Sequence, residues 1–120
     1  MIHHVQLAAP PESEDVLRSF WVGVLGFEEI EKPLPLAARG GCWFRHQEIE
    51  IHAGVEEEFR PALKAHPGLL VRGLDGWAER LEAAGYPVTW DSGFPGMRRF
   101  YSQDPFGNRL EFLESLTLGA

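Results

Sequence analysis

Hydrophobic and polar residues follow one another along this chain in an order that occurs twice. A β-like run opens at His4 and another opens at His66, and apolar residues at helical spacing follow each run. The two stripes comprise Val16/Leu17, Phe20/Trp21 and Val24/Leu25, then Leu74, Trp77/Ala78, Leu81 and Ala84. Each half is therefore predicted to begin with a strand and continue with an amphipathic helix.

Two further landmarks recur at nearly the same offset. The helix patterns end at Gly26 and Gly85, where a left-handed glycine can close a helix. Late in each half, a strand-like run places a glutamate between apolar residues, Glu50 in 48–52 and Glu111 in 109–113. The paired histidines, glycines and glutamates lie 62, 59 and 61 residues apart. We expect an α+β fold built from two tandem β-α-β-β-β modules.

The predicted modules span residues 1–54 and 66–115, and a linker at 55–65 has room for a short helix. Each half has only about 55 residues, which is too few for comfortable stability alone, so we expect one cooperative domain over 1–120. The Pro- and Gly-rich stretches 33–41 and 92–96 are expected to be loops. Residues 104–108 are expected to form a tight turn before the last strand.

Strand alternation places possible metal ligands on one face of each predicted sheet. Glu50 and Glu111 face away from apolar neighbours that would pack on a helix. If the sheets of the two modules pair, four side chains could converge: His4, Glu50, His66 and Glu111. Two imidazoles with one or two carboxylates form a ligand set for a divalent transition metal. Each residue taken alone also fits an ordinary surface or core position, so only their recurrence at equivalent positions favours a metal.

Three other histidines are weaker candidates. His52 shares the face of Glu50, and the choice between these two ligands stays open. A one-residue slip of the 45–48 hairpin would turn this face of the strand to the other side of the sheet. His3 is expected to point away from His4, and His46 is expected to be exposed near the hairpin.

Composition narrows the possible functions. The chain has 11 Lys and Arg against 18 Asp and Glu, for a net charge of −7, which argues against nucleic-acid binding and against adsorption to anionic lipid. No apolar run approaches the roughly 18 residues of a membrane span, and no signal peptide is visible. The single cysteine, Cys42, favours a cytoplasmic location and is interpreted as a small apolar core residue.

Both ends of the sequence resemble the vicinal oxygen chelate superfamily. The matching residues are His4-Val5-x-Leu7-Ala8, Phe20-Trp21, Val24-Leu25-Gly26-Phe27 and Asp104-Pro105-x-Gly107-Asn108-Arg109-Leu110-Glu111. This superfamily includes glyoxalase I, fosfomycin-resistance thiol transferases, extradiol dioxygenases, methylmalonyl-CoA epimerase and metal-free bleomycin-binding proteins. The resemblance implies modules whose mixed or antiparallel sheets curl around a metal-binding cavity, and a homodimer of swapped or unswapped modules.

Carried over by position, the resemblance implies that His4, His66 and Glu111 are metal ligands. Glu50 matches the fourth ligand, which glyoxalase I uses and which is often absent elsewhere in the superfamily. The bound ion would be Zn²⁺, Ni²⁺, Mn²⁺ or Fe²⁺, since this ligand set does not select among them. One departure is that residues 7–9 are Leu-Ala-Ala where glyoxalase I has an arginine for the glutathione carboxylate.

The favoured function is a metal-dependent lyase or isomerase of glyoxalase type, acting on a small substrate chelated through vicinal oxygens. Glu111 or Glu50 would carry the proton, and five side chains would line the substrate pocket: Arg98, Arg99, Tyr101, Trp43 and Arg45.

Three alternatives are a metal-free protein that sequesters an antibiotic-like molecule, a thiol transferase of the fosfomycin-resistance type, and a structural dimer with a vestigial cavity. In the sequestering protein, aromatic side chains would hold the ligand instead of filling the core: Trp43, Phe44, Trp90, Phe94 and Phe100. Metal content separates the enzyme from the sequestering protein.

Overall fold

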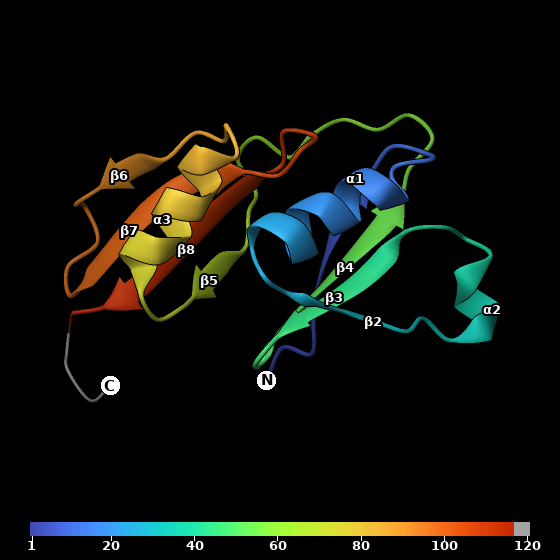
Figure 1. Ribbon diagram of the computed structural model, residues 1–120, viewed down its shortest axis with the longest axis horizontal. Coiled ribbons are helices and arrows are strands. Elements are labelled where there is room, and N and C mark those ends of the chain that lie inside the picture. The colour runs from blue at the N-terminus through green and yellow to red at the C-terminus, as the bar shows by residue number, and fades with distance from the viewer. Residues whose placement is uncertain (117–120) are drawn as a thin grey trace. The chain divides into compact units, whose positions relative to one another are not determined.

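The computed structural model describes residues 1–116 and shows two compact units, Met1–Pro61 and a second that begins at Ala62 (Figure 1). Each unit has one four-stranded mixed sheet. The strand order in the first unit is β1 (Val5–Ala9), β4 (Ile49–Val55), β3 (Cys42–His46), β2 (Glu28–Ile30). The strand order in the second unit is β5 (Gly68–Leu70), β8 (Arg109–Ser115), β7 (Met97–Gln103), β6 (Thr89–Asp91). In each sheet the first pair is parallel and the other two pairs are antiparallel. The predicted α+β fold of two β-α-β-β-β modules is confirmed.

The first helical segment differs from a plain α-helix. It consists of α1 (Glu14–Arg18) followed by a π-helix, η1 (Ser19–Val24), in which the N–H of Leu25 reaches back five residues to the carbonyl of Phe20 at 3.0 Å. The apolar pairs recur every four residues, and in an α-helix such a stripe rotates by about 40° per step. The wider π turn opposes this rotation and keeps Leu17, Phe20 and Trp21 buried. Val16, which we expected in the stripe, is 46% exposed.

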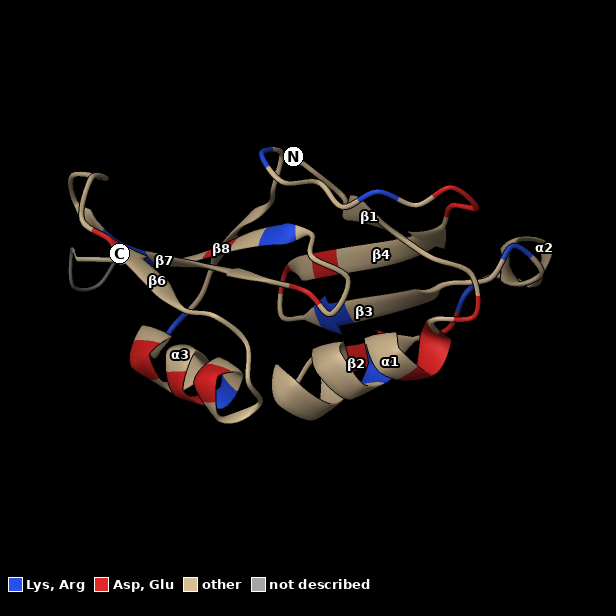
Figure 2. Ribbon diagram, turned by 90° about the horizontal axis from the view of Figure 1, so that it is seen from above, with Lys and Arg blue, Asp and Glu red and all other residues tan. Residues whose placement is uncertain are grey.

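The second helix, α3 (Leu74–Ala83), buries most of its predicted stripe: Leu74, Trp77, Ala78 and Leu81. Ala84, which we also expected in the stripe, follows the helix and is exposed. Figure 2 shows that α1 and α3 each lie on one side of their own sheet. Gly26 and Gly85 have φ angles of 76° and 89°. Both helical segments therefore end with the predicted glycine in the left-handed conformation. A residue with a side chain adopts this conformation only at a cost in free energy.

Two connections differ from the prediction. The loop at 33–41 contains a short helix, α2 (Leu34–Ala37), which proline stabilises at its first turn. The linker contains no helix, because its ends bond to the two units instead. The N–H of Glu56 donates to the carbonyl of Ala9 at 2.9 Å. Ala62 accepts from the N–H of Arg109 and donates to Asn108 Oδ1, both at 2.9 Å.

A cross-strand pair of large apolar residues forms the centre of each core. In the first unit Phe44 pairs with Ile51, in the second Phe100 pairs with Phe112, and all four are 0% exposed. These pairs face the helices, so the alternate residues on the same strands face the opposite, open side of each sheet. Cys42 is also core, at 1% exposure, and burial raises the pKa of its thiol to about 11.

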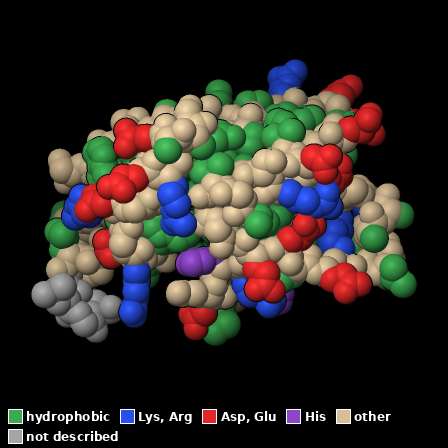
Figure 3. All heavy atoms as spheres, in the orientation of Figure 1, with side chains coloured by type: hydrophobic (Ala, Val, Ile, Leu, Met, Phe, Trp, Pro, Cys, Tyr) green, Lys and Arg blue, Asp and Glu red, His purple; other side chains and the backbone are tan. Residues whose placement is uncertain are grey.

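No helix within residues 1–116 is long and apolar enough to cross a membrane. On the face shown in Figure 3, Lys and Arg side chains are interspersed with Asp and Glu.

Candidate functional site

The open face of the first unit holds a carboxylate with both oxygens occupied. Strand register sets Arg45 opposite Glu50 and Trp43 opposite His52. Arg45 donates to Glu50 Oε1 at 2.9 Å, and His52 Nε2 donates to Glu50 Oε2 at 2.7 Å. The hydrogen bond from His52, followed by that from Arg45, lowers the pKa of Glu50 below its ordinary value. Glu50 is therefore a well-stabilised anion that makes a weak base.

His52 lies at the centre of a stack of three rings. Its imidazole is stacked on Trp43 with 3.8 Å between ring centroids and on His4 with the same separation. His52 is 4% exposed, and this burial is the main cause that lowers its pKa. The structure thus places His4 and Glu50 against the same imidazole.

The expectation for His3 was wrong. His3 Nδ1 lies 3.0 Å from His4 Nδ1 and 3.9 Å from Glu50 Oε2. Both histidines precede β1, which begins at Val5, so strand alternation does not separate their side chains.

The open face of the second unit holds a chain of alternating charged groups. His66 Nε2 lies 3.0 Å from Glu111 Oε1, and Arg99 Nη1 donates to Glu111 Oε2 at 3.1 Å. Arg99 also donates through Nη2 to Asp91 Oδ1 at 3.2 Å. Glu111 itself is 7% exposed. These contacts hold the carboxylate in one orientation beside the imidazole.

A backbone contact shows that Nδ1 of His66 carries a proton. His66 Nδ1 lies 2.7 Å from the carbonyl oxygen of Lys64, which can only accept, so Nδ1 is the donor. In the neutral imidazole, Nε2 then presents a lone pair to the Glu111 carboxylate. Two acceptors at 3.0 Å repel unless a proton or a cation lies between them. Metal-bound histidines usually have their second nitrogen anchored in this way.

The residue beside Glu111 on the neighbouring strand β5 has no side chain. Gly68 pairs with Glu111, and a Cβ at position 68 would come to 3.5 Å from Glu111 Oε1. Tyr101 stands opposite Glu111 on β7, and its ring meets that of His66 edge-on with 5.5 Å between centroids. His66 and Glu111 therefore offer one nitrogen and one oxygen donor, which fits part of a divalent-metal ligand set.

The predicted pocket residues fall on different surfaces. Trp43 and Arg45 share the open face of the first unit, and Arg99 and Tyr101 share that of the second, as strand alternation predicts. Arg98 instead turns to the helix side of its sheet and forms an ion pair with Asp75 of α3 at 2.9 Å. Neighbours on a strand point to opposite faces, so Arg98 and Arg99 leave their sheet on opposite sides.

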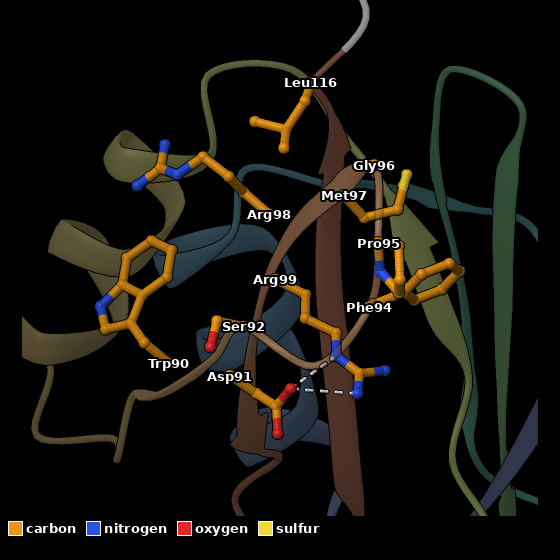
Figure 4. Close-up of a pocket in the computed structure, with 10 residues that line it drawn as sticks. All are labelled: Trp90, Asp91, Ser92, Phe94, Pro95, Gly96, Met97, Arg98, Arg99 and Leu116. Carbon is orange, nitrogen blue, oxygen red and sulfur yellow. Dashed lines mark hydrogen bonds and ion pairs between the residues drawn. The ribbon is translucent and has the colours of Figure 1, made fainter.

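A pocket of about 560 Å³ lies beside the β6–β7 hairpin (Figure 4). Trp90 and Arg98 form one side, and Phe94 and Met97 form the other. Arg99, which also binds Glu111, contributes to its lining. The aromatic residues of the sequestering alternative divide accordingly: Trp90 and Phe94 are 46% and 42% exposed, whereas Phe44 and Phe100 fill the cores.

A second pocket, of about 660 Å³, lies in the first unit between α1, β2 and the segment at 37–42. Its charged lining residues are Glu14, Arg18, Glu29, Glu31 and Lys32. None of the predicted metal ligands lines either of these two pockets.

Among residues 1–116, no group of three or more His, Cys, Asp or Glu side chains is placed to hold a metal ion. The four predicted ligands occur as one set in each unit, His66 with Glu111 in direct contact and His4 with Glu50 around His52. Sequence reasoning missed the contribution of Asp91 to this network. Its position opposite Arg99 follows from the β6–β7 register, which the sequence does not specify.

These features define a class: α+β proteins of paired β-α-β-β-β modules with His and Glu on the open faces of the sheets. The structure is similar to a protein assigned to the glyoxalase family from Bacillus anthracis, with 47% identity, a TM-score of 0.92 and coverage of 96% of this chain and 94% of that one. The chain therefore belongs to the glyoxalase family, within the vicinal oxygen chelate superfamily.

More distant structures share the fold. One is lactoylglutathione lyase from Agrobacterium tumefaciens, with 19% identity, a TM-score of 0.69 and coverage of 96% of this chain and 95% of that one. Another is the fosfomycin resistance protein FosX from Listeria monocytogenes, in complex with Mn(II) and a dihydroxypropylphosphonic acid. Its identity is 17%, its TM-score is 0.75, and the match covers 98% of this chain and 93% of that one. No family model matches the sequence, and no curated protein matches it.

Proposed function

We propose that this member of the glyoxalase family is a metal-dependent enzyme of lyase or isomerase type that acts on a small substrate with two vicinal oxygens. One observation carries the proposal: His66 Nε2 and Glu111 Oε1 lie 3.0 Å apart, with His66 Nδ1 anchored on a backbone carbonyl. A divalent cation between these two groups would satisfy both. His66 and Glu111 are therefore the first candidate ligands, and His4 and Glu50 remain candidates from the sequence.

When bound, the ion would polarise the substrate oxygens and stabilise negative charge that develops on them. The chain's own residues orient the site. Arg99 holds Glu111 through Oε2, which leaves Oε1 directed at His66. Glu111 is the better candidate for the proton carrier, because Glu50 accepts hydrogen bonds at both oxygens and its pKa is lowered.

The proposal is tested by metal analysis followed by turnover. Purified protein is stripped with a chelator, reconstituted separately with Zn²⁺, Ni²⁺, Mn²⁺ and Fe²⁺, dialysed and analysed for metal. We expect about one ion per chain for at least one metal. The loaded protein is then assayed with 2-oxoaldehyde–thiol adducts, α-hydroxy acids, catechols and fosfomycin. Binding of no metal, or turnover that is independent of metal, would contradict the proposal.

A metal-free binding protein is the second candidate. It is favoured by the ion pairs of Glu111, because the interaction of Arg99 with Asp91 and Glu111 leaves the carboxylate partnered without any metal. The exposed Trp90 and Phe94 would then bind an aromatic ligand. Titration of intrinsic fluorescence with aromatic ligands in excess chelator separates this function from the metal-dependent one.

The protein is also proposed to be a homodimer, as the superfamily resemblance implies. Light scattering on the eluate of a size-exclusion column, with and without metal, tests this directly. A mass of about 27 kDa would support the dimer, since one chain is 13.5 kDa, and a mass of one chain under both conditions would contradict it.

A further inference from the structure

Arg109 is distinctive among the charged residues on the open face of the second unit. It is the first residue of β8 and lies two positions before Glu111, so both side chains project from the same face of the strand. Alternate residues on a strand are about 6.6 Å apart. An arginine side chain is long enough to cover that distance, which places its guanidinium group within reach of a ligand bound at Glu111.

Arg109 is the one strand arginine within residues 1–116 whose guanidinium has no ion-pair partner. Four arginines lie on strands, and Arg45, Arg98 and Arg99 each form an ion pair with a carboxylate. The nearby Asp91 accepts from Arg99 and from the N–H of Gly93 at Oδ1, and it forms no ion pair with Arg109. Arg109 is only partly exposed, so five N–H donors are left without full access to water.

The guanidinium of Arg109 is held flat against an aromatic ring. Its central carbon lies 4.0 Å from the centroid of the Tyr101 ring. This cation–π contact orients the group and leaves the N–H bonds at its edge directed away from the ring. A guanidinium fixed in this way binds a planar carboxylate through two parallel hydrogen bonds.

The charges on this face favour an anionic ligand once a metal is bound. Asp91 and Glu111 supply two negative charges and Arg99 and Arg109 supply two positive ones, so these groups balance without a metal. A divalent cation would leave an excess of positive charge. An anionic substrate would restore part of that balance, and the guanidinium N–H groups of Arg109 are available to bind it.

We propose that Arg109 recognises a carboxylate of the substrate, so that the enzyme prefers small 2-hydroxy or 2-oxo acids over neutral compounds with the same vicinal oxygens. This inference rests on the proposed metal-dependent function, which supplies the second point of attachment. Arg109 acts here as a specificity residue: it binds one end of the substrate, while His66 and Glu111 hold the metal.

The test compares lactate with lactamide, which keeps both vicinal oxygens but lacks the negative charge. Calorimetric titration of Mn²⁺-loaded wild-type protein is expected to give at least about tenfold tighter binding of lactate, as for a charge-assisted contact. Arg109→Gln is expected to bring the two affinities to within about twofold while the affinity for lactamide stays unchanged. Arg109→Lys, which keeps the charge without the planar fork, is expected to fall between them.

Arg80→Gln is the matched control, because Arg80 is also stacked on an aromatic ring, Trp77, but lies exposed on α3. It is expected to keep the wild-type preference. A preference that survives Arg109→Gln, or no lactate binding by the metal-loaded wild type, would overturn the role of Arg109.

Metal content and circular dichroism are measured for every variant. If the wild type binds no metal, the proposed function fails, and lactate titration of the metal-free protein still tests the anion contact. If Arg109→Gln loses metal or unfolds, Arg109→Lys and Tyr101→Leu replace it. Tyr101→Leu removes the stacking surface and is expected to lower the preference for lactate. An unchanged preference in a folded, metal-loaded replacement would likewise overturn the proposal.

Discussion

The two units have the same strand order but differ in how the glutamate on the open face is held. In the first unit, Glu50 accepts from Arg45 and His52, and both of its oxygens are satisfied. In the second, Glu111 accepts from Arg99 at one oxygen and lies 3.0 Å from His66 Nε2 at the other. At equivalent positions of the duplicated fold, one carboxylate thus accepts hydrogen bonds at both oxygens. The other has an arginine donor at one oxygen and an imidazole nitrogen at the second, where a proton or a cation can lie between them.

The histidines of the two units also differ in how firmly their rings are held. His66 is anchored through Nδ1 on the carbonyl of Lys64, which fixes its ring and directs Nε2 at the carboxylate. The described contacts of His4 are with other imidazoles, His3 and His52. An anchored ring loses less freedom on metal binding, so we expect the second unit to contribute more to metal affinity. The following predictions compare the stability and the coupling of the two units, in order of decreasing effect.

The largest effect is expected from the core pairs. Phe44→Ala and Phe100→Ala each remove a fully buried ring from one unit, and each should lower the free energy of unfolding by about 3–5 kcal/mol. If the units fold as one domain, both variants shift a single urea transition seen by circular dichroism. Two separate transitions, each moved by only one of the variants, would show that the units are independent.

Cys42 reports on opening of the first unit. Its pKa of about 11 leaves about 100-fold less thiolate at pH 8 than an ordinary thiol has, and the residue is 1% exposed. Reaction with an aromatic disulfide reagent should therefore be at least about 100-fold slower in the native protein than in urea. Cooperative units predict that Phe100→Ala, although it lies in the other unit, accelerates this reaction. An unchanged rate in that variant would argue against cooperation.

The turns before the last strands provide a smaller contrast. Asp104, 1% exposed, accepts from the N–H groups of Phe106 and Asn108 and from Asn108 Nδ2. Asp104→Ala leaves these donors unpaired and should cost about 1–3 kcal/mol in thermal unfolding. The first unit uses a two-residue hairpin turn with Gln47 at φ 52°. Gln47→Gly relieves a left-handed residue and should change stability by less than about 1 kcal/mol. Equal losses in both variants would contradict this ranking.

The smallest effect concerns acid stability in the first unit. The pKa of Glu50 is lowered in the folded state, so its contribution is present above the ordinary glutamate pKa and lost as pH falls through the lower folded value. Glu50→Gln should therefore be less stable than wild type at pH 7, by about 1 kcal/mol or less, and the difference should be smaller at pH 3. Urea unfolding at both pH values measures the difference. A difference independent of pH would refute an electrostatic origin.

The repeat of strand and helix signals was sufficient to predict the fold from the sequence. Periodicity at 16–25 and 74–84 and the glycines that follow specify where each helix lies. The π-helical turn and the short α2 helix were not predicted, because both depend on how the apolar residues settle against their sheets. The linker at 55–65 has room for a short helix but contains none, and Glu56 and Ala62 instead form hydrogen bonds with their units.

The candidate site could be predicted only in part. Alternation correctly placed Trp43 and Arg45 on one face of their sheet, and Arg99 and Tyr101 on one face of theirs. This prediction needs only the position of each residue along its strand, not the identity of the neighbouring strand. The Arg99–Asp91 pair and the Lys64 anchor depend on strand register and loop geometry, which are set by contacts between distant residues. Alternation along β7 predicts that Arg98 and Arg99 lie on opposite faces of the sheet. The ion pair of Arg98 with Asp75 of α3 shows that Arg98 lies on the helix side.

The central claim is that His66 and Glu111 bind a divalent ion, and metal affinity measured by competition with a chromogenic chelator tests it most directly. His66→Ala and Glu111→Gln are compared with His46→Ala, a histidine outside both candidate ligand sets. We expect an affinity loss of about 100-fold or more for the first two variants and less than about twofold for His46→Ala. Wild-type affinity in a folded His66→Ala variant would contradict the claim.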